Sequence, residues 1–566
     1  MKIVTVKEMR HLEQTADADG LSYATMMENA GRAVATAIAQ RTAAEGLQVL
    51  ALIGPGNNGG DGLVVAHYLH EVSAEVTCYI WKRRVNDDQN FRRVVEDGIP
   101  VVWMKDDGDL TNLRRHATAA DVIVDALLGT GASRPIGGAL KVLLNTVKIV
   151  LQKRAAAHRP TLVSPTWPTA PSDSPLIVAV DLPTGLDADT GALDLATLLA
   201  DLTVTFACPK RGQFLFPGAD AVGELLVADI GVPEVLTADG DLQLITAERV
   251  CRLLPARPLQ AHKGTFGKAM IVAGSINYTG AAALAAAAAT RVGAGLVTLA
   301  LPRVLHGALA ATVTEPTFLL LPHDMGVLAP GGSKILAEKL PNYQALLIGP
   351  GLTTEKPTVE FVEEFFGQAG GERKRPRKSI GFLAPTQKEI DEQAGEGLAL
   401  PLMVVDADAL NILSGFEKWW ELVPARSILT PHPGEMARLV GEELDRDAIL
   451  ADRWGVARRM AAEWNQVVVL KGAFTVVAAP DDQVAVSPFA NPGLASGGTG
   501  DVLAGTVVGL LAQGLATFEA AVAGVYLHGL AAELVRSELS NAGMVASDLL
   551  PVLPEAIRLL RTGGIC

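Results

Sequence analysis

Short apolar runs alternate with longer, alanine-rich stretches along this sequence, and this alternation restricts the fold more than any other feature. In the first half the apolar runs cover residues 49–53, 76–80, 122–124, 177–180 and 202–206. In the second half they cover residues 269–273, 296–301, 345–348, 402–405, 427–430 and 467–470. Because the runs are continuously apolar, they predict strands that are covered on both faces. The sequence therefore predicts an α/β fold, with mostly parallel sheets between layers of helices.

A length of 566 residues allows roughly three or four domains, but the sequence shows one clear candidate for a domain boundary. The segment GVPEVLTADGD, residues 231–241, is rich in Pro, Gly and Asp and separates the end of a strand from a new helical start. We therefore expect two domains, residues 1–235 and 243–566. Residues 153–174 and 367–397 lack apolar periodicity, so we expect surface loops there. The basic run in the second loop favours a solvated surface over a polyanion site.

Charge and composition exclude several classes of protein. With 49% hydrophobic residues the chain can bury a large core, which excludes disorder as its main state. A formal net charge of −14 disfavours nucleic acids and anionic membranes as partners. The longest charge-free stretch, residues 269–290, is interrupted by polar residues and predicts a strand, a turn and a helix rather than a membrane span. The N-terminus lacks an apolar signal core and the four cysteines form no CxxC pair, so we expect reduced thiols and a cytoplasmic location.

A glycine-rich turn, GPGNNGGDG at residues 54–62, follows the first predicted strand directly. Glycines at such a turn allow a close backbone approach, and the following helix N-terminus offers free N–H groups to an anion. The spacing matches neither the dinucleotide-binding nor the P-loop pattern, so a simple tight turn is the alternative. Asn57, Asn58 and Asp61 favour a binding site, because side-chain oxygens in a turn can ligate a cation.

Two further strands of the first half end in aspartate. Asp125 lies in VDALLGTG and Asp181 begins DLPTG. In an open parallel sheet the ligand crevice lies beyond the carboxyl ends of the strands, so we expect both residues to face the glycine-rich turn. The alternative for each aspartate alone is a helix cap or a turn.

Together these motifs resemble the NAD(P)H-hydrate epimerase family over residues 4–233, which implies a Rossmann-like three-layer αβα domain. The resemblance implies that the hydrated dinucleotide is bound by Asn57, Asn58, Gly59, Gly60 and Asp61. It implies a phosphate-lining loop of Gly129, Thr130, Gly131, Ala132, Ser133, Arg134 and Pro135. It also implies K⁺ bound by Asn58, Asp125 and Thr184, where the family more often has serine at the last position. Asp181 would contact the hydrated ring, as an acid or base or only to orient the substrate.

A second glycine-rich turn, in NPGLASGGTGDVLAG, precedes a small-residue helix of the second half. The N–H groups of Gly497, Gly498 and Gly500 can form an anion hole at the helix start, and Asp501 lies at its mouth. A carboxylate there can take the proton of a hydroxyl that attacks a phosphoryl group. The alternative is that Asp501 caps the helix. This turn resembles that of the ribokinase-like superfamily, which implies an αβα fold and needs no Walker lysine motif.

Further motifs of the second half are KGTFGKAMIVAGS, GPGL, DADALN, PHPGE and LKGAFTVV. In this order they resemble the ADP/ATP-dependent NAD(P)H-hydrate dehydratase family over residues 246–560. The resemblance implies that the hydrated dinucleotide is contacted by Ala281, Gly351, His432 and Asp501. It implies that the adenine nucleotide is held by Lys471, Gly472, Ala473, Phe474, Thr475 and Gly500.

The chemistry of the side chains in these motifs suits a phosphoryl-transfer site. Glu435 could hold Mg²⁺ through water, and Lys471 at a strand end would bring positive charge to nucleotide phosphates. His432 alone would more often be structural, but its place in the PHPGE turn favours a ligand contact. For Asp406 and Asp408, substrate binding and helix capping remain equally open.

We therefore hypothesise a bifunctional repair enzyme that uses K⁺ in its first domain and Mg²⁺ with ADP or ATP in its second. It would interconvert the R and S epimers of hydrated NADH and NADPH (NADHX and NADPHX) and dehydrate the S epimer, with ADP favoured as the donor. The alternatives are a kinase of a small alcohol in the second half and a ligand-sensing module in the first. We also expect a homo-oligomer.

Overall fold

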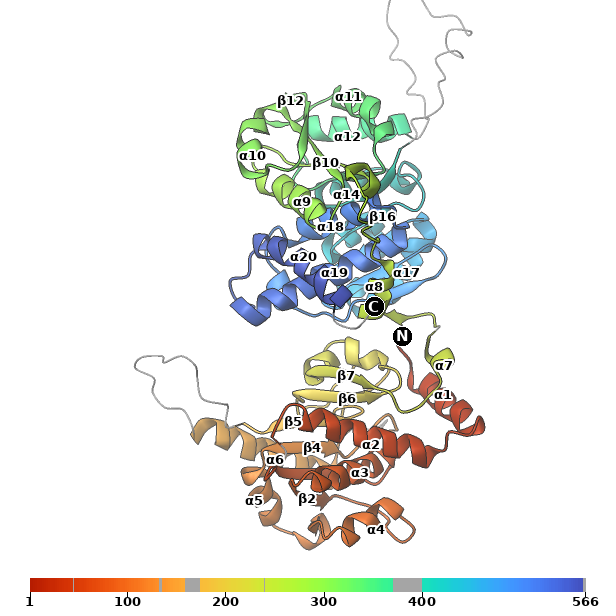
Figure 1. Cartoon of the computed structure of the whole chain (residues 1–566), viewed down its shortest axis with the longest axis vertical. Helices are drawn as coiled ribbons and strands as arrows, with labels where there is room; N and C mark the ends of the chain where they lie inside the picture. Colours follow the sequence, from red (N-terminus) through yellow and green to blue (C-terminus); the bar gives the residue numbers. More distant parts are fainter. Residues whose placement is uncertain (44, 132–134, 158–173, 239, 370–399, 563–566) are drawn as a thin grey trace, which may run out of the picture. The chain divides into compact units, whose positions relative to one another are not determined.

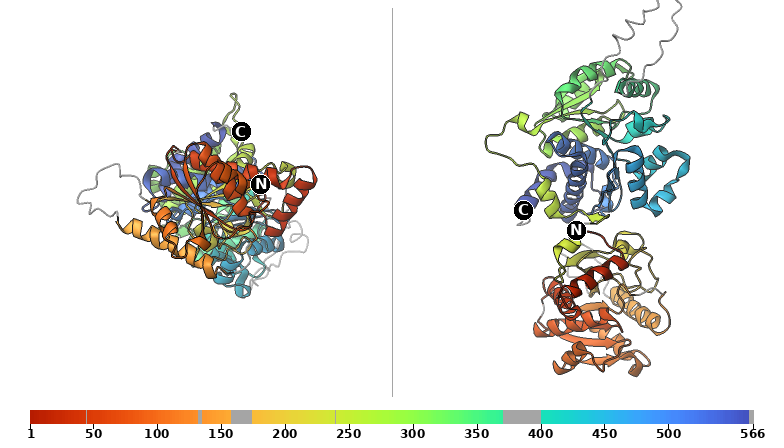
Figure 2. Two further views of the ribbon diagram at one scale, coloured as in Figure 1. Left: turned by 90° about the horizontal axis from the view of Figure 1, so that it is seen from below. Right: turned by 90° about the vertical axis from the view of Figure 1, so that its right-hand side faces the viewer.

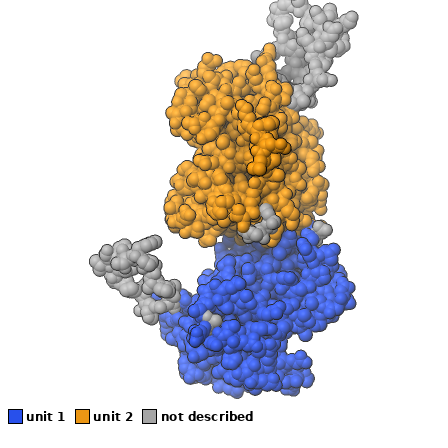
Figure 3. Space-filling model, in the orientation of Figure 1, with its two compact units in different colours: residues 1–240 blue, residues 241–566 orange. Residues whose placement is uncertain are grey.

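The computed structural model describes residues 1–43, 45–131, 135–157, 174–238, 240–369 and 400–562. The chain forms two compact units, Met1–Gly240 and Asp241–Cys566, which Figure 3 colours separately. Most of the two predicted surface loops, residues 153–174 and 367–397, lies outside the described residues.

Unit 1 is built on a sheet whose seven described strands all run parallel (Figure 1). The strand order is β3-β2-β1-β4-β5-β6-β7, so the direction of winding reverses between β1 and β4. The strands are β1 (Gln48–Ile53), β2 (Glu75–Ile80), β3 (Val101–Trp103), β4 (Val122–Ala126), β5 (Leu176–Val180), β6 (Leu202–Phe206) and β7 (Glu224–Ala228). At such a reversal the loops that follow the two strands diverge and leave room for a ligand.

Helices cover both faces of this sheet. They are α1 (Val6–Ala18), α2 (Tyr23–Ala39), α3 (Asn57–Glu71), α4 (Gln89–Glu96), α5 (Thr111–Ala119), α6 (Gly138–Ala157) and α7 (Glu234–Ala238). Successive residues of β1 enter different cores: Val49 and Ala51 pack with α2 and α3, whereas Leu50 and Leu52 pack with α5 and α6. Because side chains alternate across a strand, a continuously apolar strand serves both cores, which confirms the predicted three-layer αβα fold.

Unit 2 contains a larger sheet, described with ten strands in the order β11-β10-β9-β14-β15-β16-β17-β18-β19-β8. The strands are β8 (Gln243–Leu244), β9 (Lys268–Val272), β10 (Leu296–Pro302), β11 (Thr317–Leu321), β14 (Ala345–Ile348), β15 (Leu402–Val405), β16 (Ile428–Leu429), β17 (Val467–Leu470), β18 (Val476–Ala478) and β19 (Val484–Val486). A separate hairpin pairs β12 (His323–Asp324) with β13 (Val327–Leu328). From β11 to β17 the strands are parallel, and the winding reverses between β9 and β14.

The helices of unit 2 also form two layers, which the right-hand view of Figure 2 separates. They are α8 (Ala247–Leu253), α9 (Thr279–Arg291), α10 (His306–Thr312), α11 (Gly332–Lys339), α12 (Lys356–Ala369), α14 (Ala407–Leu413), α15 (Pro433–Val440), α16 (Arg446–Ala451), α17 (Arg453–Trp464), α18 (Thr499–Ala512), α19 (Thr517–Leu539) and α20 (Ala546–Thr562). One layer packs α9, α18, α19 and α20 into a single core with the sheet, while α17 packs against β17 and β18 outside that core.

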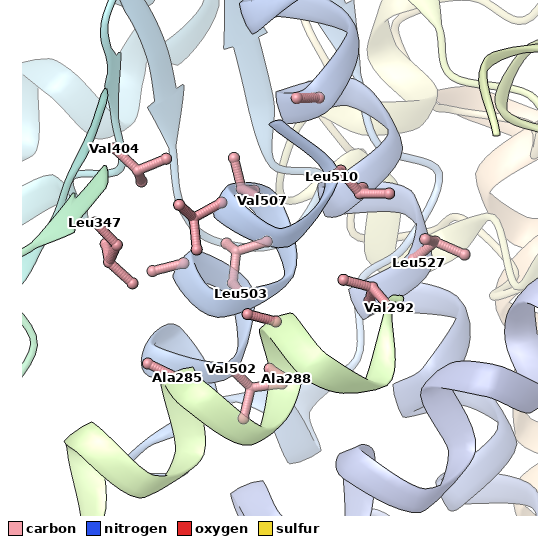
Figure 4. Close-up of a cluster of buried hydrophobic side chains, with 14 of the residues drawn as sticks. Ala285, Ala288, Val292, Leu347, Val404, Val502, Leu503, Val507, Leu510 and Leu527 are labelled. Atoms are coloured by element: carbon pink, nitrogen blue, oxygen red, sulfur yellow. The ribbon is translucent and has the colours of Figure 1, made fainter. Parts of the chain in front are cut away.

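Small residues allow α9 and α18 to lie unusually close together (Figure 4). A Cβ atom added at Gly505 would lie 2.2 Å from the carbonyl oxygen of Ala285, and one at Gly509 would lie 2.8 Å from that of Ala289. Neither position can therefore take a larger residue without moving the helices apart. Almost all of α18 is buried, so the sheet and its neighbouring helices fix the position of its N-terminus.

Every apolar run predicted from the sequence coincides with a strand. Residues 269–290 cover β9 without its first residue, a turn, and α9 without its last residue, so the predicted strand, turn and helix are confirmed. Among the described helices, α19 alone is long and apolar enough to cross a membrane, and 78% of its apolar window is buried, which is typical of a core helix. The expectation of reduced thiols is wrong for Cys251, which is disulfide-bonded, whereas Cys78 and Cys208 are free and buried.

Candidate functional site

The turn after β1 lies tightly against the turn after β4. A Cβ atom at Gly54 would lie 1.7 Å from the carbonyl oxygen of Leu127, and one at Gly59 would lie 2.1 Å from that of Gly54. The side chain of Asn58 is 3.2 Å from the position of a Cβ at Gly129. The glycines are thus required by close backbone approach, and they bring two of the predicted motifs into contact.

Asp125 and Thr184 form a buried pair at this edge of the sheet. The Thr184 hydroxyl donates to Oδ1 of Asp125 at 2.7 Å, and the Thr184 N–H donates to Oδ2 at 2.8 Å. The exposed fraction of Asp125 is only 1%, and no lysine or arginine of the described residues bonds to its carboxylate. Burial raises the pKa of Asp125, although the bonds from Thr184 oppose this. A buried carboxylate without a cationic side chain fits a site for a bound cation.

Asp181 follows β5 and is held on several sides. Its backbone is left-handed, with φ of 64°. Oδ1 accepts hydrogen bonds from Nζ of Lys210 at 2.5 Å and from Oγ1 of Thr205 at 3.0 Å. The main-chain carbonyl of Asp181 accepts a bond from Nε2 of Gln213 at 3.0 Å. Sequence reasoning missed Lys210, although its position just after β6 places it at the same carboxyl edge as Asp181.

Two more carboxyl groups lie near Asp181. Burial raises the pKa of Asp61 well above its ordinary value, and the charges of Asp181 and Glu13 add to the rise. Burial and the charge of Asp181 also raise the pKa of Glu13, a residue of α1 that sequence reasoning did not single out. A carboxyl group with a raised pKa can act as a proton donor near neutral pH.

The remaining residues predicted for this site follow β1 or β4. Asn57, Gly60 and Asp61 lie in the first turns of α3, the last two of them buried. Gly129, Thr130, Gly131 and Pro135 follow β4. Ala132, Ser133 and Arg134 lie outside the described residues.

The second site lies at the carboxyl edge of the sheet in unit 2. Nζ of Lys471 lies 2.8 Å from Oδ1 of Asp406 and 3.6 Å from Oε2 of Glu435. Asp406 also accepts a hydrogen bond from the Thr430 hydroxyl at 2.7 Å. Burial lowers the pKa of Lys471, but the charges of Asp406 and Glu435 outweigh it, so the net shift is upward. The ammonium therefore stays charged.

The N-terminus of α18 meets this charged group. Gly498 caps the helix in the left-handed conformation, with φ of 90°, and a Cβ at Gly500 would lie 3.5 Å from Nζ of Lys471. Burial, assisted by the charge of Asp406, raises the pKa of Asp501 to about 7. Gly497 and Gly498 directly precede α18, and Gly500 is its second residue. This arrangement brings together a carboxyl group with a pKa near neutral, a helix N-terminus and a cation.

His432 caps α15. Its Nδ1 accepts hydrogen bonds from the N–H groups of Gly434 at 2.9 Å and Glu435 at 3.2 Å, while Oε2 of Glu435 accepts from the N–H of His432 at 2.7 Å. Burial lowers the pKa of His432. The histidine thus has a structural bond through Nδ1, and half of its side chain remains exposed for a ligand contact.

Glu435 is the one predicted Mg²⁺ contact of this site. No three His, Cys, Asp or Glu residues of the described chain are grouped so that they could hold a metal ion. A Mg²⁺ ion at Glu435 would therefore take most of its ligands from phosphates and water, which is common for this ion.

Arg453 holds the loop after β17. Its guanidinium donates to the carbonyl groups of Leu470 at 3.1 Å and Lys471 at 3.3 Å, and also to that of Ala473. Phe474 has a left-handed φ of 52°, which is strained for a residue with a side chain, and the bonds from Arg453 stabilise the loop in this shape. Thr475 closes the loop with a bond from its hydroxyl to the carbonyl of Gly472 at 2.8 Å. Sequence reasoning missed Arg453, whose pKa burial lowers to about 10.

Ala281 and Gly351 meet although they follow different strands. A Cβ at Gly351 would lie 2.9 Å from Cβ of Ala281 and 2.7 Å from Cβ of Tyr278. Asp408 binds the loop after β14 by accepting a hydrogen bond from the N–H of Thr353 at 2.9 Å. These contacts join the loops after β9, β14 and β15 at one edge of the sheet. Asp501 lies close to this edge, because the charge of Asp408 contributes to the rise of its pKa.

Known families match both units. A family described as NAD(P)H-hydrate dehydratase matches residues 269–370 and 385–555, and one described as YjeF-related protein N-terminus matches residues 23–212. A solved structure of the ADP/ATP-dependent NAD(P)H-hydrate dehydratase from Bacillus subtilis is 29% identical, with a TM-score of 0.45. It covers 56% of this chain and 98% of its own.

Curated relatives match the whole length. The bifunctional NAD(P)H-hydrate repair enzyme Nnr of Moorella thermoacetica is 37% identical over 575 residues, covering 99% of this chain and 97% of the relative. The enzyme of the same name from Escherichia coli K12 is 32% identical, covering 96% of this chain and 91% of the relative. The chain therefore belongs to the family of bifunctional NAD(P)H-hydrate repair enzymes.

Proposed function

We propose that this chain repairs hydrated nicotinamide dinucleotides at two separate sites. The first domain, residues 1–235, interconverts the R and S epimers of NADHX and NADPHX. The second, residues 243–566, dehydrates the S epimer to NADH or NADPH at the expense of ADP or ATP, with ADP as the preferred donor. The observation that carries this proposal is Asp501, a base with a pKa of about 7 at the start of α18 and beside Lys471.

Dehydration needs a better leaving group than hydroxide. Asp501 takes the proton of the C6 hydroxyl while that oxygen attacks the terminal phosphorus of the nucleotide, whose bond to the bridging oxygen breaks. The C6–O bond then breaks, with the electron pair of N1 assisting, and phosphate leaves. Loss of a proton from C5 restores the dihydropyridine. Each step conserves charge and atoms, and the nucleotide supplies the driving force.

The surrounding residues hold the two ligands. Backbone N–H groups of Gly497, Gly498 and Gly500 bind the transferred phosphate at the helix N-terminus. The nucleotide is bound by Lys471, Gly472, Ala473, Phe474, Thr475 and Gly500. The hydrated dinucleotide is bound by Ala281, Gly351, His432 and Asp501. The close contact between Gly351 and Ala281, and the exposed half of the His432 ring, support these assignments.

Epimerisation needs a reversible change at C6. Asp181 takes the proton of the C6 hydroxyl, the carbonyl bond forms, and the C6–N1 bond breaks with its electron pair moving to N1. The protonated Asp181 then protonates N1. When the ring closes, N1 attacks the opposite face of the C6 carbonyl and returns its proton to Asp181, which gives the other epimer. The dinucleotide is bound by Asn57, Asn58, Gly59, Gly60 and Asp61, with phosphates along Gly129, Thr130, Gly131, Ala132, Ser133, Arg134 and Pro135.

Two cations would complete the sites. The amide, carboxylate and hydroxyl oxygens of Asn58, Asp125 and Thr184 suit K⁺, which would supply positive charge for the dinucleotide phosphates. The buried carboxylate of Asp125, to which no lysine or arginine of the described residues bonds, supports this assignment. Glu435 would orient Mg²⁺ through water, and Mg²⁺ would neutralise charge on the nucleotide phosphates.

The test is to incubate the protein with each epimer of hydrated NADH, with ADP, with ATP and with neither. Recovery of absorbance at 340 nm reports dehydration, and chromatographic separation of the epimers without nucleotide reports epimerisation. Asp501→Ala should abolish dehydration alone. Asp181→Asn should slow epimerisation alone, by about 10² to 10⁴-fold, to a residual rate that can still be measured. Loss of both activities in either folded variant would contradict two separate sites.

A small-alcohol kinase in the second half and a ligand-sensing module in the first are not favoured. Relatives named as bifunctional NAD(P)H-hydrate repair enzymes match nearly the whole chain. A kinase would accumulate a phosphorylated small alcohol, and a sensing module would bind hydrated NADH without turnover. The same proposal includes a homo-oligomer that works in the cytoplasm and binds neither nucleic acid nor membrane. Light scattering of the purified protein tests the oligomer.

A further inference from the structure

We propose that Lys210 is a positioning residue for epimerisation: its buried ammonium fixes one carboxylate oxygen of Asp181 and leaves the other for the substrate. This inference rests on the proposed epimerase function and extends it to a residue outside the predicted set. Lys210 follows β6, and its exposed fraction is 1%.

The contacts of Lys210 show that it can act only through its neighbours. Nζ donates to Oδ1 of Asp181 at 2.5 Å, to Oγ1 of Thr205 at 2.8 Å and to the carbonyl oxygen of Phe206 at 3.2 Å. An ammonium has three N–H donors, so these acceptors use all of them. Lys210 therefore has no donor left for a ligand and contacts the reaction through Asp181.

The two oxygens of the Asp181 carboxylate are thereby made different. Oδ1 accepts from both Lys210 and Thr205, whereas Oδ2 has no hydrogen-bond partner among the described residues. Gln213 locks the backbone on either side: its Nε2 donates to the carbonyl of Asp181 at 3.0 Å, and its Oε1 accepts from the N–H of Lys210 at 2.8 Å. The free oxygen, Oδ2, is the one that can exchange a proton with substrate.

The charges around Asp181 explain why a lysine is needed. The negative charge of Asp181 raises the pKa of Asp61 in α3 and that of Glu13 in α1. The positive charges of Arg83 and Lys210 act in the opposite direction on the pKa of Asp61. Three carboxyl groups in one partly buried region repel one another. Lys210 is the cation in direct contact with Asp181, so it compensates this carboxylate individually.

A purely structural ion pair is the competing explanation. Buried pairs contribute little net stability, because desolvation of both charges offsets their attraction. The two explanations differ in what happens when both partners are removed. If Lys210 acts through Asp181, its removal costs nothing further once the Asp181 carboxylate has gone.

The experiment compares Lys210→Met, Asp181→Asn and the double variant in the full-length protein. Thr205→Val is the matched control, since it removes a bond to the same oxygen without removing charge. Epimer interconversion without nucleotide gives kcat and KM, and dehydration of the S epimer in the same chain tests the other unit. Thermal unfolding monitors whether unit 1 folds.

We expect Lys210→Met to lower kcat for epimerisation by about 100-fold, within the range of about 10² to 10⁴ for a positioned acid or base. KM should change less than about threefold, and Thr205→Val should lower kcat less than about tenfold. The double variant should match Asp181→Asn, which keeps the inference testable if Lys210→Met alone unfolds. Dehydration should be unchanged in all variants.

Two results would overturn the inference. One is a kcat for epimerisation that is lower in the double variant than in Asp181→Asn by the full factor that Lys210→Met causes alone. The other is a rise in KM in Lys210→Met with kcat unchanged. A wild-type protein that does not interconvert the epimers would instead refute the proposed function. The wild-type measurement therefore separates failure of the inference from failure of the function on which it rests.

Discussion

The pH dependence of dehydration follows directly from the surroundings of Asp501. Burial, with the charge of Asp406 next in size, raises its pKa to about 7, and a general base works only when ionised. With that pKa, the ionised fraction is about one-tenth at pH 6 and about nine-tenths at pH 8. We therefore expect kcat/KM for dehydration to rise about tenfold between these pH values.

The rise of kcat/KM with pH, centred on the pKa of Asp501, is the acidic limb of the pH profile. Asp406→Asn should move this limb in a known direction. It removes a negative charge that raises the pKa of Asp501, and it frees Lys471, whose charge lowers that pKa. A neighbouring charge shifts the pKa of a carboxyl group by about one to three units. A shift of one pH unit corresponds to about 1.4 kcal/mol. The limb should thus move to about pH 6 or below, and about half of Asp501 would then be ionised at pH 6.

The assay is recovery of absorbance at 340 nm from the S epimer at limiting substrate, from pH 5.5 to 9, at constant ionic strength. For each variant, kcat/KM at a given pH is divided by its constant value at high pH, so a loss of absolute rate does not change the position of the limb. Asp447→Asn, which removes an exposed carboxylate of the same unit, should leave the limb at about 7. A limb that stays in place in Asp406→Asn, or that moves upward, would refute the electrostatic argument.

Three further outcomes are expected. Gly505→Ala places a Cβ 2.2 Å from the carbonyl oxygen of Ala285, so chemical denaturation should show unit 2 destabilised by about 1 to 3 kcal/mol, with epimerisation retained. Thr184→Val removes the hydroxyl that bonds Asp125 at 2.7 Å, and epimerisation should fall and lose its response to KCl relative to NaCl. Arg453→Lys cannot reach all the carbonyl groups that the guanidinium now holds, so KM for the nucleotide should rise about tenfold while epimerisation is unchanged.

The sequence predicted the parallel strands well because each is buried on both faces and is therefore continuously apolar. Residues 49–53, for example, coincide with β1 apart from one residue. The missed strands carry a weaker signal. β7 has an exposed first residue and three half-buried ones, and β8 has only two residues. Short or half-exposed edge strands gain little apolar burial, so their sequences are less constrained.

The motifs also placed Asp125, Asp181 and Asp501 correctly at the carboxyl ends of strands or at a helix start, because topology brings such positions together. Lys210 and Arg453 were missed for a different reason. Their partners are main-chain carbonyl groups and, for Lys210, the carboxylate that follows β5, which leave no pattern in the local sequence. A lysine four residues after the end of a buried parallel strand was the available signal for Lys210.

The two buried lysines illustrate how one residue type serves different tasks. Lys210 is almost inaccessible and gives every donor to the protein, so it fixes a carboxylate in place. Lys471 keeps 18% of its side chain exposed and makes ion pairs of 2.8 Å and 3.6 Å, at Asp406 and Glu435. An incoming phosphate can compete for its ammonium, and the carboxylates keep that ammonium charged until then. The free donor capacity of each lysine, rather than its charge, thus separates a positioning role from a binding role.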